Sequence, residues 1–190
     1  MKYISILVLG VTILCASSAC STARLSDIVL QKSDLPDGFT VEAISKRDDL
    51  INELTDNQGL AQLINNMLID AYQVKYSFDD PYLKIRYQEI WCTAYSWKPD
   101  NPGIFNAPFF YNYAIGKINM DKVKTSNPGI GDESLAIEYA DGLTVTRIIW
   151  WYKTYDFEIV SIGVLPSQSV DLVLLARTIQ ERIERFDEAK

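Results

Sequence analysis

The stretch SLAIEYADGLTVTRIIWWYKTYDFEIVSIGV, residues 134–164, determines the fold class that the sequence predicts. It contains three segments in which apolar and β-branched residues alternate with polar ones, the pattern of strands whose two faces are buried differently. The segments are residues 134–140, 143–153 and 157–164. Asp141-Gly142 is a strong hairpin signal, and a second turn is expected near residues 154–156. The stretch therefore predicts a three-stranded antiparallel meander.

The segment after this meander has a helical period. Its apolar residues recur every three or four positions: Leu172, Leu175, Ala176, Ile179, Ile183 and Phe186. Pro166 ends the preceding strand, and Ser167 or Ser169 can cap the helix that follows. An amphipathic helix buries its apolar stripe, so we expect this C-terminal helix to lie on a face of the sheet.

Upstream segments supply the other elements. Alternating apolar and polar residues predict a strand pair, and helical spacing predicts several helices. Turn residues mark the start of a short first strand. We expect strands at residues 39–44, 72–78 and 83–97, and helices at residues 25–31, 48–56, 59–71 and 108–118. The predicted fold class is α+β: a mainly antiparallel β-sheet with helices packed on its faces and a C-terminal amphipathic helix.

The N-terminal residues, MKYISILVLGVTILCASSAC, have the pattern of an export signal. Lys2 gives a short positive start, and an eleven-residue apolar run follows from Ile4 to Leu14. That length suits a signal peptide and is too short to span about 30 Å of hydrocarbon. We therefore expect residues 1–19 to be a signal peptide.

Small residues precede Cys20, and the stretch Ser17-Ser18-Ala19-Cys20 resembles a lipoprotein lipobox, with Ser17 where an aliphatic residue is usual. The resemblance implies lipidation of Cys20, residues 20–24 as the lipidated cysteine and a short tether, and residues 25–190 as a single α+β domain. Cleavage after Ala19 without acylation would give a secreted soluble protein instead. A third possibility is that the segment is retained as a buried helix.

Two short motifs and the closing helix carry a further resemblance. Residues 34–39 read Asp-Leu-Pro-Asp-Gly-Phe, and residues 131–134 read Gly-Asp-Glu-Ser at the start of a hairpin. Together with the C-terminal helix, they resemble uncharacterised exported prokaryotic lipoproteins with a PsbP/Mog1-like domain, over most of residues 25–187. The resemblance implies a binding or assembly module and brings no catalytic residues with it.

Composition excludes several chemistries. The 190 residues include no histidine, so Ser-His-Asp and Cys-His nucleophiles and histidine-ligated zinc are excluded. The formal net charge is −7 and becomes −8 when Lys2 is removed with the signal, which disfavours nucleic acid as a partner. After export and acylation the remaining cysteine would be Cys92, which we expect to be a small buried hydrophobe rather than a reactive thiol. Phosphate-binding and dinucleotide-binding motifs are absent from the sequence.

Acidic pairs occur at Asp48/Asp49, Asp79/Asp80 and Asp132/Glu133. We expect them to be solvated, because neighbouring carboxylates in turns usually point at water. A calcium site at the second pair or at residues 127–133 is an alternative, although the EF-hand ligand spacing is missing. We predict no metal and no cofactor.

Aromatic residues are concentrated in two predicted strands. Trp91, Tyr95 and Trp97 share one face of the first by period two, and in the second the adjacent Trp150 and Trp151 point to opposite faces. Either these side chains are core and sheet surface, or some of them line a groove for an apolar ligand, a sugar ring or a peptide.

The sequence thus predicts an exported, lipid-anchored cell-envelope protein that acts as a non-enzymatic binding or assembly module. Its expected partners are the membrane, through the lipid, and an envelope protein or a small ligand. The alternatives are a histidine-free, carboxylate-dependent hydrolase and a purely structural envelope component.

Overall fold

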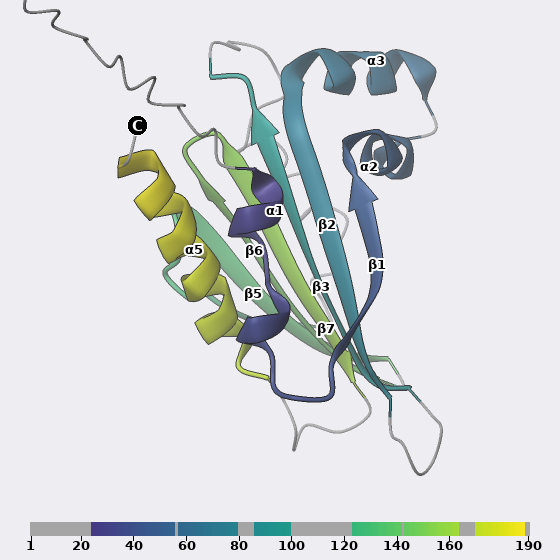
Figure 1. The fold of residues 1–190 in the computed structure, drawn as a ribbon, viewed down its shortest axis with the longest axis vertical. Helices are drawn as coiled ribbons and strands as arrows, with labels where there is room; N and C mark the ends of the chain where they lie inside the picture. Colours follow the sequence, from purple (N-terminus) through teal and green to yellow (C-terminus); the bar gives the residue numbers. More distant parts are fainter. Residues whose placement is uncertain are drawn as a thin grey trace, which may run out of the picture.

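The computed structural model describes residues 24–55, 57–79, 86–99, 123–141, 143–163 and 170–188. In them the chain forms a seven-stranded antiparallel sheet of order β1-β2-β3-β7-β6-β5-β4, with helices on both faces (Figure 1). The strands are β1 (Thr40–Lys46), β2 (Leu68–Asp79), β3 (Arg86–Trp97), β4 (Lys124–Ser126), β5 (Glu133–Asp141), β6 (Leu143–Tyr152) and β7 (Tyr155–Gly163). The helices are α1 (Leu25–Ile28), α2 (Arg47–Leu54), α3 (Gln58–Met67) and α5 (Leu172–Glu188), with a 3-10 turn at Lys32–Asp34. The α+β prediction and the meander β5-β6-β7 are confirmed.

The main core lies between one sheet face and α5. Helix α5 buries the predicted stripe, and Ile179 and Ile183 are fully covered. Opposite them lie Ile90, Ile148 and Ile159, from three different strands, all at 0% exposure. We call this side of the sheet the α5 face. Asp171 caps the helix, since its Oδ1 accepts a hydrogen bond from the Leu174 amide at 3.0 Å.

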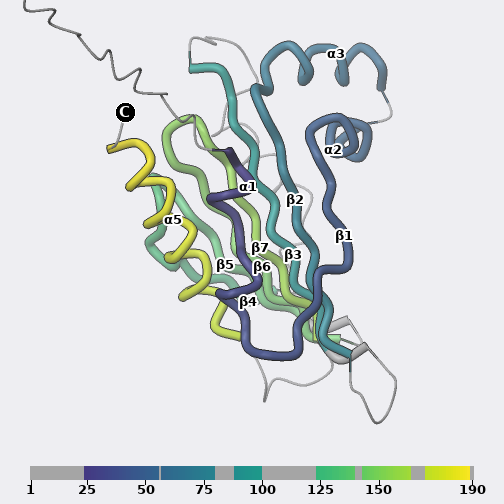
Figure 2. Tube along the Cα trace, in the orientation of Figure 1, coloured from purple at the N-terminus to yellow at the C-terminus, as the bar shows by residue number. Residues whose placement is uncertain are grey.

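The N-terminal segment completes this core. From α1 the chain runs along the α5 face to the far end of the sheet and returns as the edge strand β1 (Figure 2). Asp34, the first residue of the motif at residues 34–39, accepts two hydrogen bonds from Arg182 of α5, at 2.8 and 2.5 Å. Gly38 has φ +102, and a Cβ there would lie 2.5 Å from the Phe78 ring, so the motif requires glycine. Phe39 is 4% exposed, and the motif thus ties the segment to the sheet and to α5.

The motif at residues 131–134 also has a structural role. Gly131 has φ +63, and its missing side chain leaves room for the carbonyl oxygen of Trp151. The Asp132 carboxylate accepts a hydrogen bond from the Lys153 amide at 2.7 Å, which holds the β6–β7 turn. Ser134 donates a hydrogen bond to Asn127 and accepts one from the Ile130 amide, both at 3.0 Å. These contacts fix the loop before β5.

A second, smaller core lies on the opposite face, under α2 and α3. It contains Leu50, Ile51, Ile64, Leu68, Ala71 and Trp97. Asn57 caps α3, because its Oδ1 accepts a hydrogen bond from the Leu60 amide at 3.1 Å. Each sheet face therefore packs against different helices.

Two predicted helices have the wrong length. The helix expected at 25–31 ends at Ile28, because the Gln31 side chain donates to the Ser26 and Val29 carbonyls at 2.8 and 2.9 Å, and the chain turns away. The helix expected at 59–71 ends at Met67, because the next residues pair with β3 as the start of β2. The apolar spacing of residues 68–71 suits a helix or a strand, and pairing with β3 makes them a strand.

The remaining differences are small. Strand β4 was not predicted, and Asp156 belongs to β7 rather than to the turn before it. The helix predicted at 108–118 and the caps at Ser167 and Ser169 lie outside the described residues.

Candidate functional site

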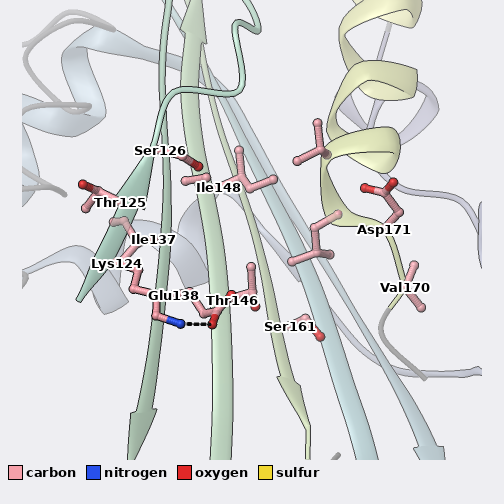
Figure 3. Close-up of a pocket in the computed structure, with 13 residues that line it drawn as sticks. Lys124, Thr125, Ser126, Ile137, Glu138, Thr146, Ile148, Ser161, Val170 and Asp171 are labelled. Carbon is pink, nitrogen blue, oxygen red and sulfur yellow. Dashed lines mark ion pairs between the residues drawn. The ribbon is translucent and has the colours of Figure 1, made fainter. Parts of the chain in front are cut away.

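A groove opens on the α5 face, between the strands β4–β7 and the start of α5 (Figure 3). Its volume is about 540 Å³. It is lined by Lys124, Thr125, Ser126, Ala136, Ile137, Glu138, Thr146, Ile148, Ser161, Val170, Asp171, Leu172 and Val173. Sites of roughly 300–1,000 Å³ hold most small ligands, so the groove has the size of a small-molecule site.

The groove combines apolar walls with neutral polar groups. Ile148 and Leu172 contribute apolar surface from the sheet and from α5. Thr146 and Ser161 are neighbours across β6 and β7 and bring hydroxyl groups to the sheet side. Gln88 donates a hydrogen bond to Ser161 Oγ at 2.8 Å, which fixes the orientation of this hydroxyl group. The groove thus offers hydroxyl groups beside apolar surface, and that of Ser161 is oriented.

Charge is confined to the rim. Lys124 and Glu138 form an exposed ion pair, with 3.7 Å between Nζ and Oε1. Asp171 lies on the other side, at the start of α5 (Figure 3). Because Asp171 already caps this helix, the amide of Leu174 is not available to an anionic ligand. The lining therefore favours a largely neutral ligand with an apolar body and hydrogen-bonding groups.

The predicted aromatic residues lie mostly on the opposite face of the sheet. By strand register, this face presents Trp91, Tyr95, Trp97, Trp151, Asp156 and Glu158. We call it the aromatic face. Trp150 points to the α5 face, where it is 0% exposed and stacks on Phe157 with 5.0 Å between ring centroids. The structure thus groups four of the five predicted binding residues and separates Trp150 from them.

Two of the predicted binding residues are held by internal hydrogen bonds. Trp97 Nε1 donates to Asp156 Oδ2 at 2.7 Å, and Trp150 Nε1 donates to Gln180 Oε1 at 3.1 Å. Trp91, Tyr95 and Trp151 are only half-buried, and the Lys75 ammonium lies 5.3 Å from the centroid of the Trp91 ring. A binding role for these aromatic residues stays a prediction, and half-burial makes Trp91, Tyr95 and Trp151 its stronger candidates.

The aromatic face contains two carboxyl groups on one strand. Asp156 and Glu158 lie two residues apart on β7, and burial raises the pKa of both. For Asp156, the Trp97 hydrogen bond opposes this rise. For Glu158, the ion pair with Arg147 opposes it. Burial also raises the pKa of Tyr95, which pairs with Asp156 across β3 and β7.

Two polar atoms near these carboxyl groups lack a partner in the described part of the chain: Asp156 Oδ1 and Trp151 Nε1. Two carboxyl groups on one face can support acid–base chemistry when a substrate reaches both. Asp156 is only 5% exposed, so a substrate could contact it only after the residues around it moved. Burial favours the neutral form of Asp156, and the pair as it stands is not open to a substrate.

The other predicted chemical groups have structural surroundings. Cys92 is fully buried, and burial raises the pKa of its thiol to about 12, which confirms it as a buried hydrophobe. Asp48 and Asp49 lie in the first turn of α2, where negative charge is favourable. In the residues that the structure describes, no cluster of three or more metal-ligating side chains occurs.

Comparison with known proteins finds a similarity of fold. No family model and no curated protein matches the chain. The structure is similar to the crystal structure of the extracellular domain of PknH from Mycobacterium tuberculosis, with a TM-score of 0.52 and 10% sequence identity. The similarity covers 84% of this chain and 94% of that one. No helix among the described residues is long and apolar enough to span a membrane.

Sequence reasoning missed the groove residues Thr146 and Ser161 and the pair Asp156/Glu158. Threonine and serine in strands carry no signal of their own, since they are common on any sheet surface. The acidic pair did leave a signal. Asp156 and Glu158 alternate with Phe157 and Ile159, and carboxyl groups within so apolar a strand mark an unusual face.

Proposed function

We propose that this protein is exported, anchored to a membrane by acylated Cys20, and acts as a non-enzymatic binding module that holds a small, mainly neutral ligand in the groove beside α5. The groove carries the proposal, because its volume, its apolar walls and the oriented Ser161 hydroxyl group suit such a ligand. The net charge of −7 argues against nucleic acid as the ligand.

Two observations support the location outside the cytoplasm. The first 19 residues have the pattern of a signal peptide, and the structural neighbour is an extracellular domain. The absence of histidine and the burial of Asp156 support a binding role over catalysis.

A groove-filling variant tests the binding role. Ala136 lies in the groove, so Ala136→Phe would occupy part of its volume, whereas Ala43→Phe makes the same change on the exposed edge strand β1. Each full-length protein is purified from membranes of the host that exports it, and its bound small molecules are extracted and identified by mass spectrometry. We expect one compound class to accompany the wild-type and Ala43→Phe proteins and to be depleted from Ala136→Phe. Equal amounts in all three proteins, or none in any, would contradict the proposal.

Labelling with a palmitate analogue tests the anchor. We expect the wild-type protein to be labelled and the Cys20→Ala variant to be unlabelled. Equal labelling of the two would exclude Cys20 as the acylated residue.

A further inference from the structure

We infer that the end of the domain where α3 lies rests against the phospholipid surface, and that Leu63 and Ile69 contact the lipid. This inference relies on the proposed acylation of Cys20. It concerns a surface that is separate from the groove.

The position where the described chain begins gives the first argument. Arg24 immediately precedes α1, which packs beside β2. Burial, and to a smaller extent the nearby Asp27 carboxylate, raises the pKa of Tyr72 near the start of that strand. At the same end, Lys98 donates its amide hydrogen to the Met67 carbonyl at 3.0 Å, and Lys153 pairs with Asp187 at 3.0 Å. Figure 1 shows α3, the start of α1 and the end of α5 at this one end of the molecule. We call it the anchor end.

The length of the tether gives the second argument. Four residues separate Cys20 from Leu25, namely Ser21 to Arg24. Even fully extended, four residues reach only about 14 Å, so an acylated Cys20 holds the anchor end close to the bilayer in any tether conformation. The groove lies at the start of α5, and this helix of 17 residues spans about 25 Å, so the groove is at the end of the helix distant from the lipid.

The chemistry of α3 gives the third argument. Its sequence, QGLAQLINNM, contains no charged residue, although the chain has 25 acidic and 18 basic side chains. Leu63 on α3 is 48% exposed and Ile69 at the start of β2 is 52% exposed. A domain with a net negative charge is repelled by anionic lipid, and an uncharged helix with exposed apolar side chains is the surface that this repulsion affects least.

Leucines at the two ends of the molecule provide a matched test. Leu63 lies at the anchor end, and Leu143, 41% exposed, begins β6 at the opposite end of the sheet. The variants Leu63→Cys, Ile69→Cys and Leu143→Cys are each labelled with a polarity-sensitive fluorophore, since the buried Cys92 is protected from the reagent. The acylated full-length proteins are then reconstituted into vesicles of equal parts phosphatidylcholine and phosphatidylglycerol, with and without lipids that carry a quencher.

We expect the labels at positions 63 and 69 to shift to shorter wavelength and to lose emission with the quenching lipid, and the label at position 143 to be unchanged. Thermal unfolding of each variant checks that its fold is intact. If the mass of the protein shows acylated Cys20 but the label at position 63 is quenched no more than the label at position 143, the proposed orientation is wrong and the lipid anchor is confirmed. If Cys20 carries no lipid, both the anchor and the orientation are wrong.

Discussion

Replacing Asp156 by asparagine should stabilise the protein at neutral pH and remove part of its pH dependence. The Asp156 carboxyl group is 5% exposed, and its Oδ1 has no partner among the described residues. Burial raises its pKa well above the ordinary value of 3.8. Between these two pKa values, the folded state holds a proton that the unfolded state has already lost. Asparagine keeps an oxygen for the Trp97 hydrogen bond and carries no ionisable proton.

The sign and size of the effect follow from proton linkage. Below pH 3.8 both states bind the proton and Asp156 contributes no pH dependence. Between this value and the raised pKa of the folded state, only the folded state binds it, so the free energy of unfolding falls with rising pH by about 1.4 kcal/mol per pH unit. The stability that the protonated group contributes is therefore lost as pH rises towards the folded pKa. The Asp156→Asn variant lacks this slope, so its advantage over wild type grows with pH across the window.

Urea unfolding, followed by tryptophan fluorescence between pH 4 and pH 8, measures the effect. We expect the two stability curves to diverge with rising pH until the folded pKa is passed. The Asp37→Asn variant removes an exposed carboxyl group, and it controls for the change in net charge. Wild-type and Asp156→Asn curves that stay parallel over this range would refute the reasoning. Glu158, whose pKa burial also raises, retains its own contribution in both proteins.

Three further predictions concern single contacts. In urea unfolding, Gly129→Ala should lower the free energy of unfolding by about 1–2 kcal/mol, because φ is +64 with open space around the residue. Gly131→Ala should lower it by about 3 kcal/mol or more, because its Cβ would also lie 2.3 Å from a carbonyl oxygen; equal losses would contradict this. Arg182→Met should cost about 3 kcal/mol in the same assay, since it leaves the partly buried Asp34 carboxylate without its bidentate partner; a neutral result would show that the pair contributes nothing. Cys92 should react with a thiol reagent only as fast as the protein unfolds, because the thiol is buried with a pKa of about 12; rapid labelling of the native protein would contradict this.

The spacing of apolar residues and the turn-forming residues predicted most of the fold. The apolar stripe from Leu172 to Phe186 predicted the C-terminal helix, and Asp141-Gly142 predicted a hairpin, because both signals are local. The end of α3 at Met67 could not be read from the sequence. Leu68 and Ala71 continue the helical spacing, and only their pairing with Trp97 and Tyr95 of β3, which are distant in sequence, makes them a strand.

The candidate site was less predictable. Period two correctly separated Trp150 from Trp151, and it placed Trp91, Tyr95 and Trp97 on one face. The groove depends on which strands become neighbours: β7 inserts between β3 and β6, and this brings Gln88 of β3 within hydrogen-bonding distance of Ser161. No pattern along the chain encodes that neighbourhood, so neither residue was marked as functional.

The intact mass of the protein extracted from membranes of an exporting host tests the central claim most directly. The account predicts a chain that begins at Cys20 and carries added acyl groups, with residues 1–19 absent. An unmodified chain from Met1 to Lys190, recovered in the cytosol, would contradict it.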